Sequence, residues 1–129
     1  MGKLVADAVL DASLQYLEDN VTWISVCEGA ATSYENAHSN KGTGSGMVLA
    51  HSATVTFTGP AEGDASGRKT AIDAVSAMAV DVAGTADHIT LCDTVASALL
   101  YVTTCSSQAL ATGNTVTAPT WDIEIADPT

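Results

Sequence analysis

Short runs of alternating apolar and polar residues, separated by glycine, proline, asparagine, aspartate and serine, make up most of this 129-residue chain. A period of two is typical of β-strands with one buried face. The pattern centres on residues 86–104, which predict two strands joined by a tight turn at Asp93 and Thr94. The second strand carries bulk on both faces from Leu99 to Val102. We therefore expect it to lie inside a sheet, covered on both sides.

Further strands are predicted along the rest of the chain. They cover residues 21–28, 47–58, 68–73, 75–82, 105–111 and 115–126, with a turn-rich loop at residues 59–67. In the last segment the apolar Trp121, Ile123 and Ile125 alternate with Asp122 and Glu124, so the apolar set should face inward. Seven to eight strands with frequent turns indicate a mainly β, antiparallel β-sandwich or jelly-roll-like domain.

One segment, residues 4–19, predicts an N-terminal α-helix, because it holds good helix formers and neither glycine nor proline. Its polar side chains fall on one narrow ridge, and the apolar arc around the rest is wider than a helix lying on its own domain needs. Either the helix is sunk into the domain or its outer flank meets another chain. The candidate interface residues on this segment are Val5, Val9, Leu10, Leu14, Tyr16 and Leu17.

Residues 29–46 form a long polar stretch rich in glycine, serine and asparagine, which predicts an exposed loop with little structure of its own. A loop of this length is often functional or becomes ordered on a partner. Tyr34 is its only large side chain and a further candidate interface anchor. We expect one domain, residues 1–129, with a helical segment at 1–20 and the β-sandwich at 21–129.

The charge of the chain excludes two classes of partner. Fifteen acidic residues face four basic ones, a formal net charge of −11. Binding of nucleic acid or of an anionic membrane surface requires a cluster of cations, which four scattered bases cannot supply. The acidity serves either solubility or complementarity to a basic protein surface.

The three cysteines and the N-terminus indicate where the chain is made. Cys27, Cys92 and Cys105 are odd in number and widely spaced, which predicts neither a disulfide framework nor a zinc site. The first residues do not resemble a signal peptide, and no apolar run approaches membrane-spanning length. We expect free thiols and synthesis in a reducing cytoplasm.

The glycine-rich segment at residues 63–70, GDASGRKT, resembles a phosphate-binding loop only superficially. Three residues separate its glycines where the motif needs four, and Arg68 stands between the second glycine and Lys69. No strand–loop–helix pattern surrounds it. A turn between strands is the better interpretation.

Other candidate chemistry is equally weak. The histidines His38, His51 and His88 lie on separate predicted elements without metal-ligand spacing, and no GxSxG motif is present. Trp23 and Trp121 fall on the apolar phase of their strands and are either core residues or interface anchors. We therefore expect no catalytic residue, no metal or cofactor site and no enzymatic activity.

Several short segments carry a resemblance that covers nearly the whole chain in order. They are residues 7–12 with Leu14, 27–28 with 32–37, 63–69, 84–88, and 113–116 with 121–128. On these segments the chain resembles a family of small virion proteins encoded by tailed bacteriophages. Within that family it looks most like a head decoration, or cement, protein.

The resemblance implies a small β-domain that binds between major capsid subunits on the outer capsid and resists the internal pressure of the DNA. It implies the major capsid protein as partner, self-association as a trimer or dimer, and a place on the virion after synthesis in the host bacterium. It carries no catalytic residue. A tail, neck or head-fibre component stays open, as does a carbohydrate-binding β-sandwich that would use exposed aromatic residues.

Overall fold

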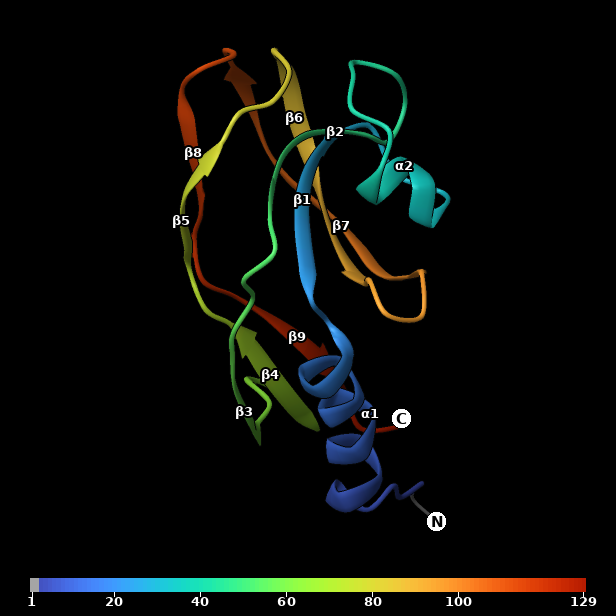
Figure 1. Ribbon diagram of the computed structural model, residues 1–129. Helices are drawn as coiled ribbons and strands as arrows, with labels where there is room; N and C mark the ends of the chain where they lie inside the picture. Colours follow the sequence, from blue (N-terminus) through green and yellow to red (C-terminus); the bar gives the residue numbers. More distant parts are fainter. Residues whose placement is uncertain (1–2) are drawn as a thin grey trace. The chain divides into compact units, whose positions relative to one another are not determined.

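A computed structural model describes residues 3–129, which contain nine strands and two helices (Figure 1). The helices are α1 (Asp7–Asn20) and α2 (Tyr34–His38), and the strands are β1 (Trp23–Glu28), β2 (Met47–Ser52), β3 (Phe57–Glu62), β4 (Arg68–Ile72), β5 (Val75–Ala79), β6 (Gly84–Asp93), β7 (Ala98–Leu110), β8 (Thr115–Ala118) and β9 (Trp121–Ile125). All the strand ladders are antiparallel. The predicted mainly β class with one N-terminal helix is confirmed. Met1 and Gly2, part of the expected segment 1–20, lie outside the described residues.

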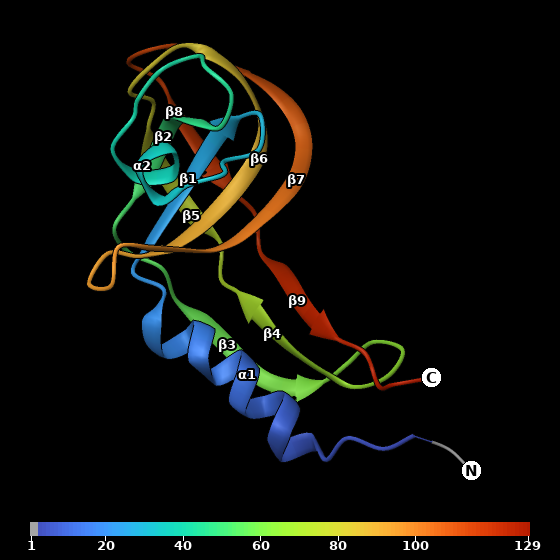
Figure 2. The same ribbon diagram turned by 90° about the vertical axis from the view of Figure 1, so that its right-hand side faces the viewer.

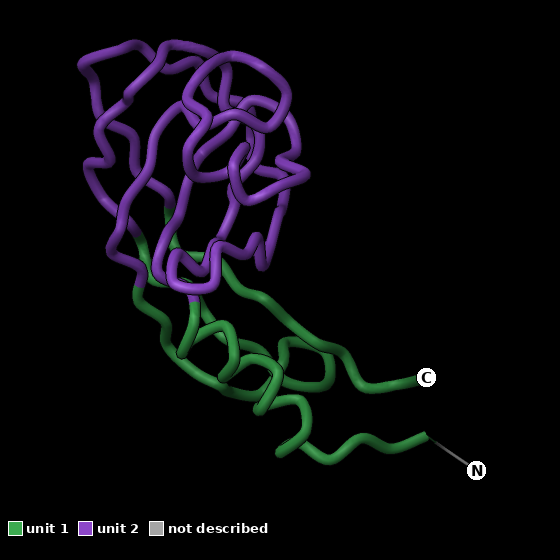
Figure 3. Tube along the Cα trace, turned by 45° about the vertical axis from the view of Figure 1, so that its right-hand side comes forward, with its two compact units in different colours: residues 1–20, 56–74, 119–129 green, residues 21–55, 75–118 purple. Residues whose placement is uncertain are grey.

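The chain forms two compact units, which Figure 3 distinguishes by colour. Unit 1 comprises residues 1–20, 56–74 and 119–129, and unit 2 comprises residues 21–55 and 75–118. The helical segment was expected to stand beside a sandwich running from 21 to 129. Instead β3, β4 and β9 group with α1, because a small sheet needs a cover for its apolar face.

Unit 1 is a three-stranded sheet, in the order β3-β4-β9, with α1 in contact with β3 and β4. In β9, Ile123 is buried and Trp121 and Ile125 are half-buried, whereas Asp122 and Glu124 are exposed. The alternation predicted for this strand is therefore confirmed. Its apolar phase faces the inside of the unit.

Unit 2 is built on a four-stranded sheet in the order β2-β1-β6-β7, accompanied by the two-stranded ladder of β5 and β8 (Figure 2). Its core is made of small and medium aliphatic side chains, as the low aromatic content requires. The largest fully buried ones are Ile24, Leu49, Leu91 and Val48. β6 is the most deeply buried strand, since five consecutive residues at its end are buried.

The expectation that the strand after Asp93 lies inside the sheet is wrong. β6 is the inner strand and β7 lies at the edge. Residues 99–102 are half-buried, and Leu99 packs against the cluster of Ala31, Ala37 and Cys92. Bulk on both faces of a strand reports what covers its faces. It does not report whether a second strand pairs with its outer edge.

Two predicted strands are each divided between the units. The segment 47–58 breaks into β2 and β3, because the Ser52 side chain hydrogen-bonds with the backbone of Thr54 in place of a ladder partner. The expected loop 59–67 is partly strand, since β3 continues to Glu62 through a bulge. The segment 115–126 breaks into β8 and β9 on either side of Pro119 and Thr120.

The segment 29–46 has more structure than expected. It contains α2, whose N-cap Ser33 accepts a hydrogen bond from the Asn36 backbone N–H at 3.2 Å. Ala37 is fully buried, and its carbonyl accepts hydrogen bonds from Trp23 Nε1 at 3.0 Å and Ser25 Oγ at 2.7 Å. These contacts fasten α2 to β1, so this part of the segment is packed and not a free loop.

Candidate functional site

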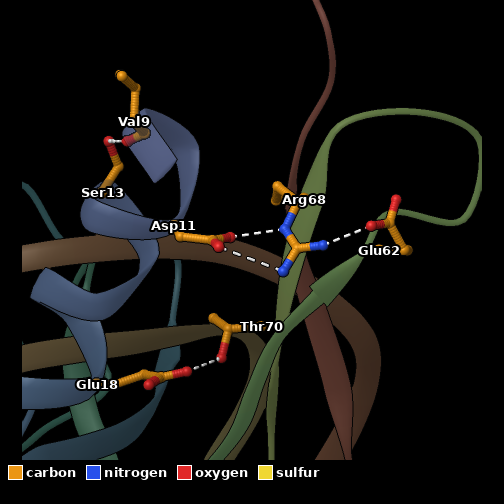
Figure 4. Close-up of polar contacts among 7 residues, drawn as sticks. All are labelled: Val9, Asp11, Ser13, Glu18, Glu62, Arg68 and Thr70. Atoms are coloured by element: carbon orange, nitrogen blue, oxygen red, sulfur yellow. Dashed lines mark hydrogen bonds and ion pairs between the residues drawn. The ribbon is translucent and has the colours of Figure 1, made fainter. Parts of the chain in front are cut away.

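The inner side of α1 carries both its buried leucines and two of the four residues of its polar ridge, which consists of Asp7, Asp11, Gln15 and Glu18. Leu10 and Leu14 are 7% and 0% exposed. Asp11 and Glu18, which the sequence places on the polar ridge, project toward β4 (Figure 4). The helix is therefore docked on its own unit through a mixed apolar and acidic side.

Arg68 of β4 is the main polar partner of α1. Its Nε lies 2.6 Å from Asp11 Oδ1 and its Nη2 lies 3.3 Å from Asp11 Oδ2, while Nη1 lies 2.6 Å from Glu62 Oε1 (Figure 4). The hydrogen bond with Asp11 raises the pKa of the Arg68 guanidinium. A second hydrogen bond joins the strand to the helix: Thr70 Oγ1 donates to Glu18 Oε1 at 2.6 Å. Two polar contacts thus fix the orientation of the helix on the sheet.

The outer side of α1 exposes apolar side chains. Val9 and Tyr16 are 59% and 54% exposed, and Ala12 lies exposed between them in sequence. Val9 points away from β4 (Figure 4). Spacings of three and four residues place these side chains in one row along the helix. We call Val9, Ala12 and Tyr16 the outer stripe; none of its members carries a charge.

The predicted interface residues fall into separate groups. Val9 and Tyr16 belong to the outer stripe, whereas Val5 and Leu17 are half-buried. Placing Leu10 and Leu14 at an interface is wrong, because both are buried within unit 1 and cannot touch a partner while the helix stays docked.

Tyr34, the remaining candidate, lies in unit 2. It is half-buried and stacks on His38 with ring centroids 4.8 Å apart and an interplanar angle of 15°. Burial raises the pKa of its phenol. Tyr34 is part of the attachment of α2 and does not belong to the outer stripe.

Val95 is an exposed apolar residue that the sequence reading missed. It is 90% exposed in the turn between β6 and β7. Asp93 Oδ1 accepts the backbone N–H groups of Val95 at 2.9 Å and Ala96 at 3.1 Å, and Thr94 N–H donates to Thr22 Oγ1 at 3.0 Å. Three hydrogen bonds hold this turn, and it exposes a valine to solvent. In the sequence, the position of this valine directly after the turn residues Asp93 and Thr94 was the feature that could have indicated an exposed apolar side chain.

Two histidines that the sequence places on separate elements meet at Trp23. The His51 ring stacks on the indole with centroids 4.3 Å apart and planes 11° apart, and the His38 ring lies against it at 4.3 Å and 48°. His51 Nδ1 lies 2.7 Å from Asp81 Oδ2, which Lys41 Nζ also approaches at 3.3 Å. This cluster joins α2 to β1 and β2.

The histidine contacts do not form a hydrolytic relay. His38 Nδ1 lies 3.0 Å from Ser39 Oγ, whereas the carboxylate of Asp81 contacts His51. A triad needs the hydroxyl and the carboxylate on opposite nitrogens of one imidazole, and here they contact different rings. Within residues 3–129, no group of three His, Cys, Asp or Glu side chains is arranged to hold a metal ion.

The three cysteines are free thiols. Cys27 and Cys92 are fully buried, and burial raises the pKa of Cys27 and raises that of Cys92 to about 12. Since the thiolate is the reactive form, both side chains are poor nucleophiles at neutral pH. Cys105 on β7 is half-buried, and burial raises its pKa as well.

The acidity is concentrated in unit 1. This unit holds ten acidic and three basic residues, a net charge of −7, against five acidic and one basic residue, a net charge of −4, in unit 2. Lys69 of β4 lies between two of these carboxylates: its Nζ is 2.5 Å from Asp64 Oδ1 and 3.1 Å from Asp122 Oδ2. Of the helices in the described part of the chain, neither has the length and apolar character needed to cross a membrane.

Comparison with known proteins assigns no family to the chain: no protein-family model matches it, and no curated protein or solved structure is significantly similar to it. Its function must therefore be inferred from the residues and surfaces of the chain itself.

Proposed function

We propose that this chain is a non-enzymatic structural protein of a bacteriophage virion, which binds the outside of the capsid between major capsid subunits and stabilises the head. The observation that carries the proposal is the outer stripe of α1. A helix held on one side by Arg68 and Thr70 exposes Val9 and Tyr16 on the other. The sequence resemblance supplies the class of partner.

A docked helix suits this role because it is ordered before it binds. Arg68 and the buried Leu14 already hold α1 on the sheet, so the helix does not have to form at the moment of contact. Preorganisation of this kind reduces the entropy lost on association. Tyrosine is also among the residues most enriched in the centre of protein interfaces.

The uncharged character of the outer stripe supports the same role. The chain carries a net charge of −11, yet Val9, Ala12 and Tyr16 can be buried without taking a carboxylate out of water. The surrounding acidity keeps unassembled copies apart in solution. Many copies that each bury a modest area would stabilise a shell collectively.

A place in the tail, the neck or a head fibre would use the same stripe, and the number of copies per particle separates these alternatives from the capsid. A carbohydrate-binding role has less support. Trp23, the tryptophan of the unit 2 sheet, is stacked by His51 and approached by His38, so a sugar ring would have to displace imidazole contacts.

The proposal is tested by adding the purified chain to undecorated heads of the phage that encodes it. Co-sedimentation measures binding, and the melting temperature of the heads measures stabilisation. We expect the chain to bind and to raise the melting temperature. We expect Tyr16→Glu to weaken binding at least about tenfold, the effect of losing a contact of about 1.4 kcal/mol.

Thr112→Glu is the matched control, because it adds the same charge at an exposed threonine in the turn after β7. It should bind like the unaltered chain. Heads that do not bind the unaltered chain, or equal effects of the two substitutions, would contradict the proposal. A few copies per virion would place the chain in the neck or a fibre.

A further inference from the structure

The loop between α2 and β2, residues 39–46, is rich in glycine and is followed by a large apolar side chain, Met47 (Figure 1). Three of its residues are glycines, and apart from Lys41 its other side chains are small and polar. Glycine loses more backbone freedom on ordering than any other residue. Such a loop adopts one conformation only when contacts with neighbouring groups offset this loss. We call residues 41–46 the glycine loop.

The thioether of Met47 packs directly against the glycine loop. A Cβ atom built on Gly44 would lie 2.8 Å from Met47 Sδ and 2.9 Å from Met47 Cε, and one built on Gly42 would lie 3.2 Å from Met47 Sδ. Real Cβ atoms essentially never come within 3.0 Å of another heavy atom. The sulfur and its methyl group therefore occupy the space that any side chain at Gly44 would need, in dispersion contact with the backbone.

Backbone hydrogen bonds link Met47 to both ends of the glycine loop. The Met47 N–H donates to the Gly44 carbonyl at 3.0 Å. The next residue, Val48, donates its N–H to the Asn40 carbonyl at 2.9 Å, and its carbonyl accepts the Gly42 N–H at 3.2 Å. The loop thus closes on the residue that carries the thioether and on its neighbour, so a displacement of the Met47 side chain acts directly on the loop.

The thioether is also open to chemical change. Of the methionines in the described part of the chain, Met47 is half-buried, whereas Met78 on β5 is only 3% exposed. With hydrogen peroxide, the sulfur lone pair attacks one peroxide oxygen, an S–O bond forms and the O–O bond breaks. The second oxygen leaves as water, so the sulfur is oxidised to a sulfoxide and the peroxide is reduced. A sulfoxide is polar and larger than a thioether.

We infer that Met47 is a site of oxidation by peroxide and that its sulfoxide releases the glycine loop. The added oxygen needs space that the backbone at Gly44 does not leave, and burying its polarity without a hydrogen bond is unfavourable. The Lys41–Gly42 bond then becomes accessible to a protease. The salt bridge from Lys41 Nζ to Asp81 Oδ2, 3.3 Å long, is half exposed and holds the side chain only. This inference does not depend on capsid binding.

Trypsin digestion of the folded full chain tests the inference. Trypsin can cleave after Lys3, Lys41, Arg68 and Lys69. The last two lie in β4, which pairs with strands on both sides, so cleavage after Lys41 reports the opening of the glycine loop. We expect peroxide treatment to accelerate this cleavage at least about tenfold, because the rate follows the population of the open form.

Peptide masses after complete digestion locate the oxidation, since Met47 and Met78 fall in different tryptic peptides, 42–68 and 70–129. We expect Met47 to be oxidised at least about tenfold faster than Met78, because susceptibility follows exposure. A Met47 that reacts no faster than Met78 would overturn the inference.

Met47→Leu is the matched control, because leucine has a similar volume and no sulfur. Peroxide should leave the cleavage of this variant after Lys41 unchanged, which also controls for oxidation of Cys105. Met47→Gln places a polar group at the same position and should be cleaved faster than the unaltered chain without peroxide. Unchanged cleavage of a fully oxidised chain, or equal acceleration of Met47→Leu by peroxide, would contradict the release of the loop.

Discussion

At the scale of single residues, two apolar side chains of α1 have opposite surroundings although the sequence gives them similar character. Leu14 is 0% exposed and Val9 is 59% exposed. We expect Leu14→Ala to lower the free energy of unfolding of unit 1 by about 2–5 kcal/mol, because it leaves a cavity. Val9→Ala should change it by no more than about 0.5 kcal/mol.

Urea denaturation followed by the fluorescence of Trp121, which lies in unit 1, measures both effects when Trp23 is replaced by phenylalanine. Similar losses for the two substitutions would show that α1 is not docked through Leu14. They would also remove the basis for treating Val9 as a free surface residue.

Asp87 provides a pH-dependent test in unit 2. Its Oδ1 lies 2.7 Å from His88 Nδ1 and accepts the Gly29 backbone N–H at 2.7 Å, and these contacts, that of His88 first, lower the pKa of Asp87. A carboxyl with a lowered pKa in the folded state stabilises the fold above its unfolded pKa of about 3.9 and loses this effect as the pH falls through the folded pKa.

We therefore expect Asp87→Asn to destabilise unit 2 at neutral pH and to differ progressively less from the unaltered chain below about pH 4. Urea denaturation at a series of pH values, followed by Trp23, measures the difference. A difference that does not change with pH would show that the Asp87 contacts do not stabilise the fold.

The polar ridge of α1 can be predicted from the sequence, but the surface that it contacts cannot. Residue spacing places Asp11 and Glu18 on one ridge, and in the structure both contact the sheet. Their partners Arg68 and Thr70 lie more than fifty positions away in the sequence. A helical period identifies which residues share a side. It cannot identify which side of the helix contacts a basic residue on a strand that is distant in the sequence.

At the scale of elements, α2 depends on buried polar contacts to β1. Ser25 Oγ donates to the Ala37 carbonyl and is hydrogen-bonded with Thr90 Oγ1, and both Ser25 and Thr90 are fully buried. Ser25→Ala removes these bonds and should destabilise unit 2 by about 1–3 kcal/mol, the effect of leaving buried polar groups without partners.

Ser76→Ala, at an exposed serine of β5, is the matched control and should change the stability by less than about 0.5 kcal/mol. Urea denaturation followed by Trp23 compares the two, and hydrogen exchange at α2 shows whether the helix loosens. Equal stabilities of both variants would show that Ser25 does not fasten α2.

Most strands could be predicted from their alternation of apolar and polar residues, as β9 shows. Their positions in the sheets could not. The segment 47–58 looks like one strand, and the local hydrogen bonds of Ser52 break it into β2 and β3, which lie in different units. β7 looks internal and lies at an edge. Strand order depends on pairing between distant segments, which a local period does not contain.

At the scale of the whole molecule, each unit contains one tryptophan, Trp121 in unit 1 and Trp23 in unit 2. The net charges of −7 and −4 mean that carboxylate repulsion is stronger in unit 1. Added salt screens this repulsion. We expect sodium chloride to raise the urea midpoint reported by Trp121 more than the midpoint reported by Trp23.

Single-tryptophan variants, Trp23→Phe and Trp121→Phe, allow each midpoint to be measured at low and high salt. Equal shifts of the two midpoints would contradict the charge argument. A larger salt-induced shift of the midpoint reported by Trp23 would show that charge repulsion is stronger in unit 2.

The proposal as a whole is that this chain is a structural protein whose exposed apolar residues, Val9 and Tyr16 above all, contact a capsid. Cryo-electron microscopy of virions carrying the chain tests this most directly. We predict density for the chain between major capsid subunits, with the outer stripe of α1 against the shell. Density confined to the tail or neck, or capsid contact through another surface with Val9 and Tyr16 left in solvent, would contradict it.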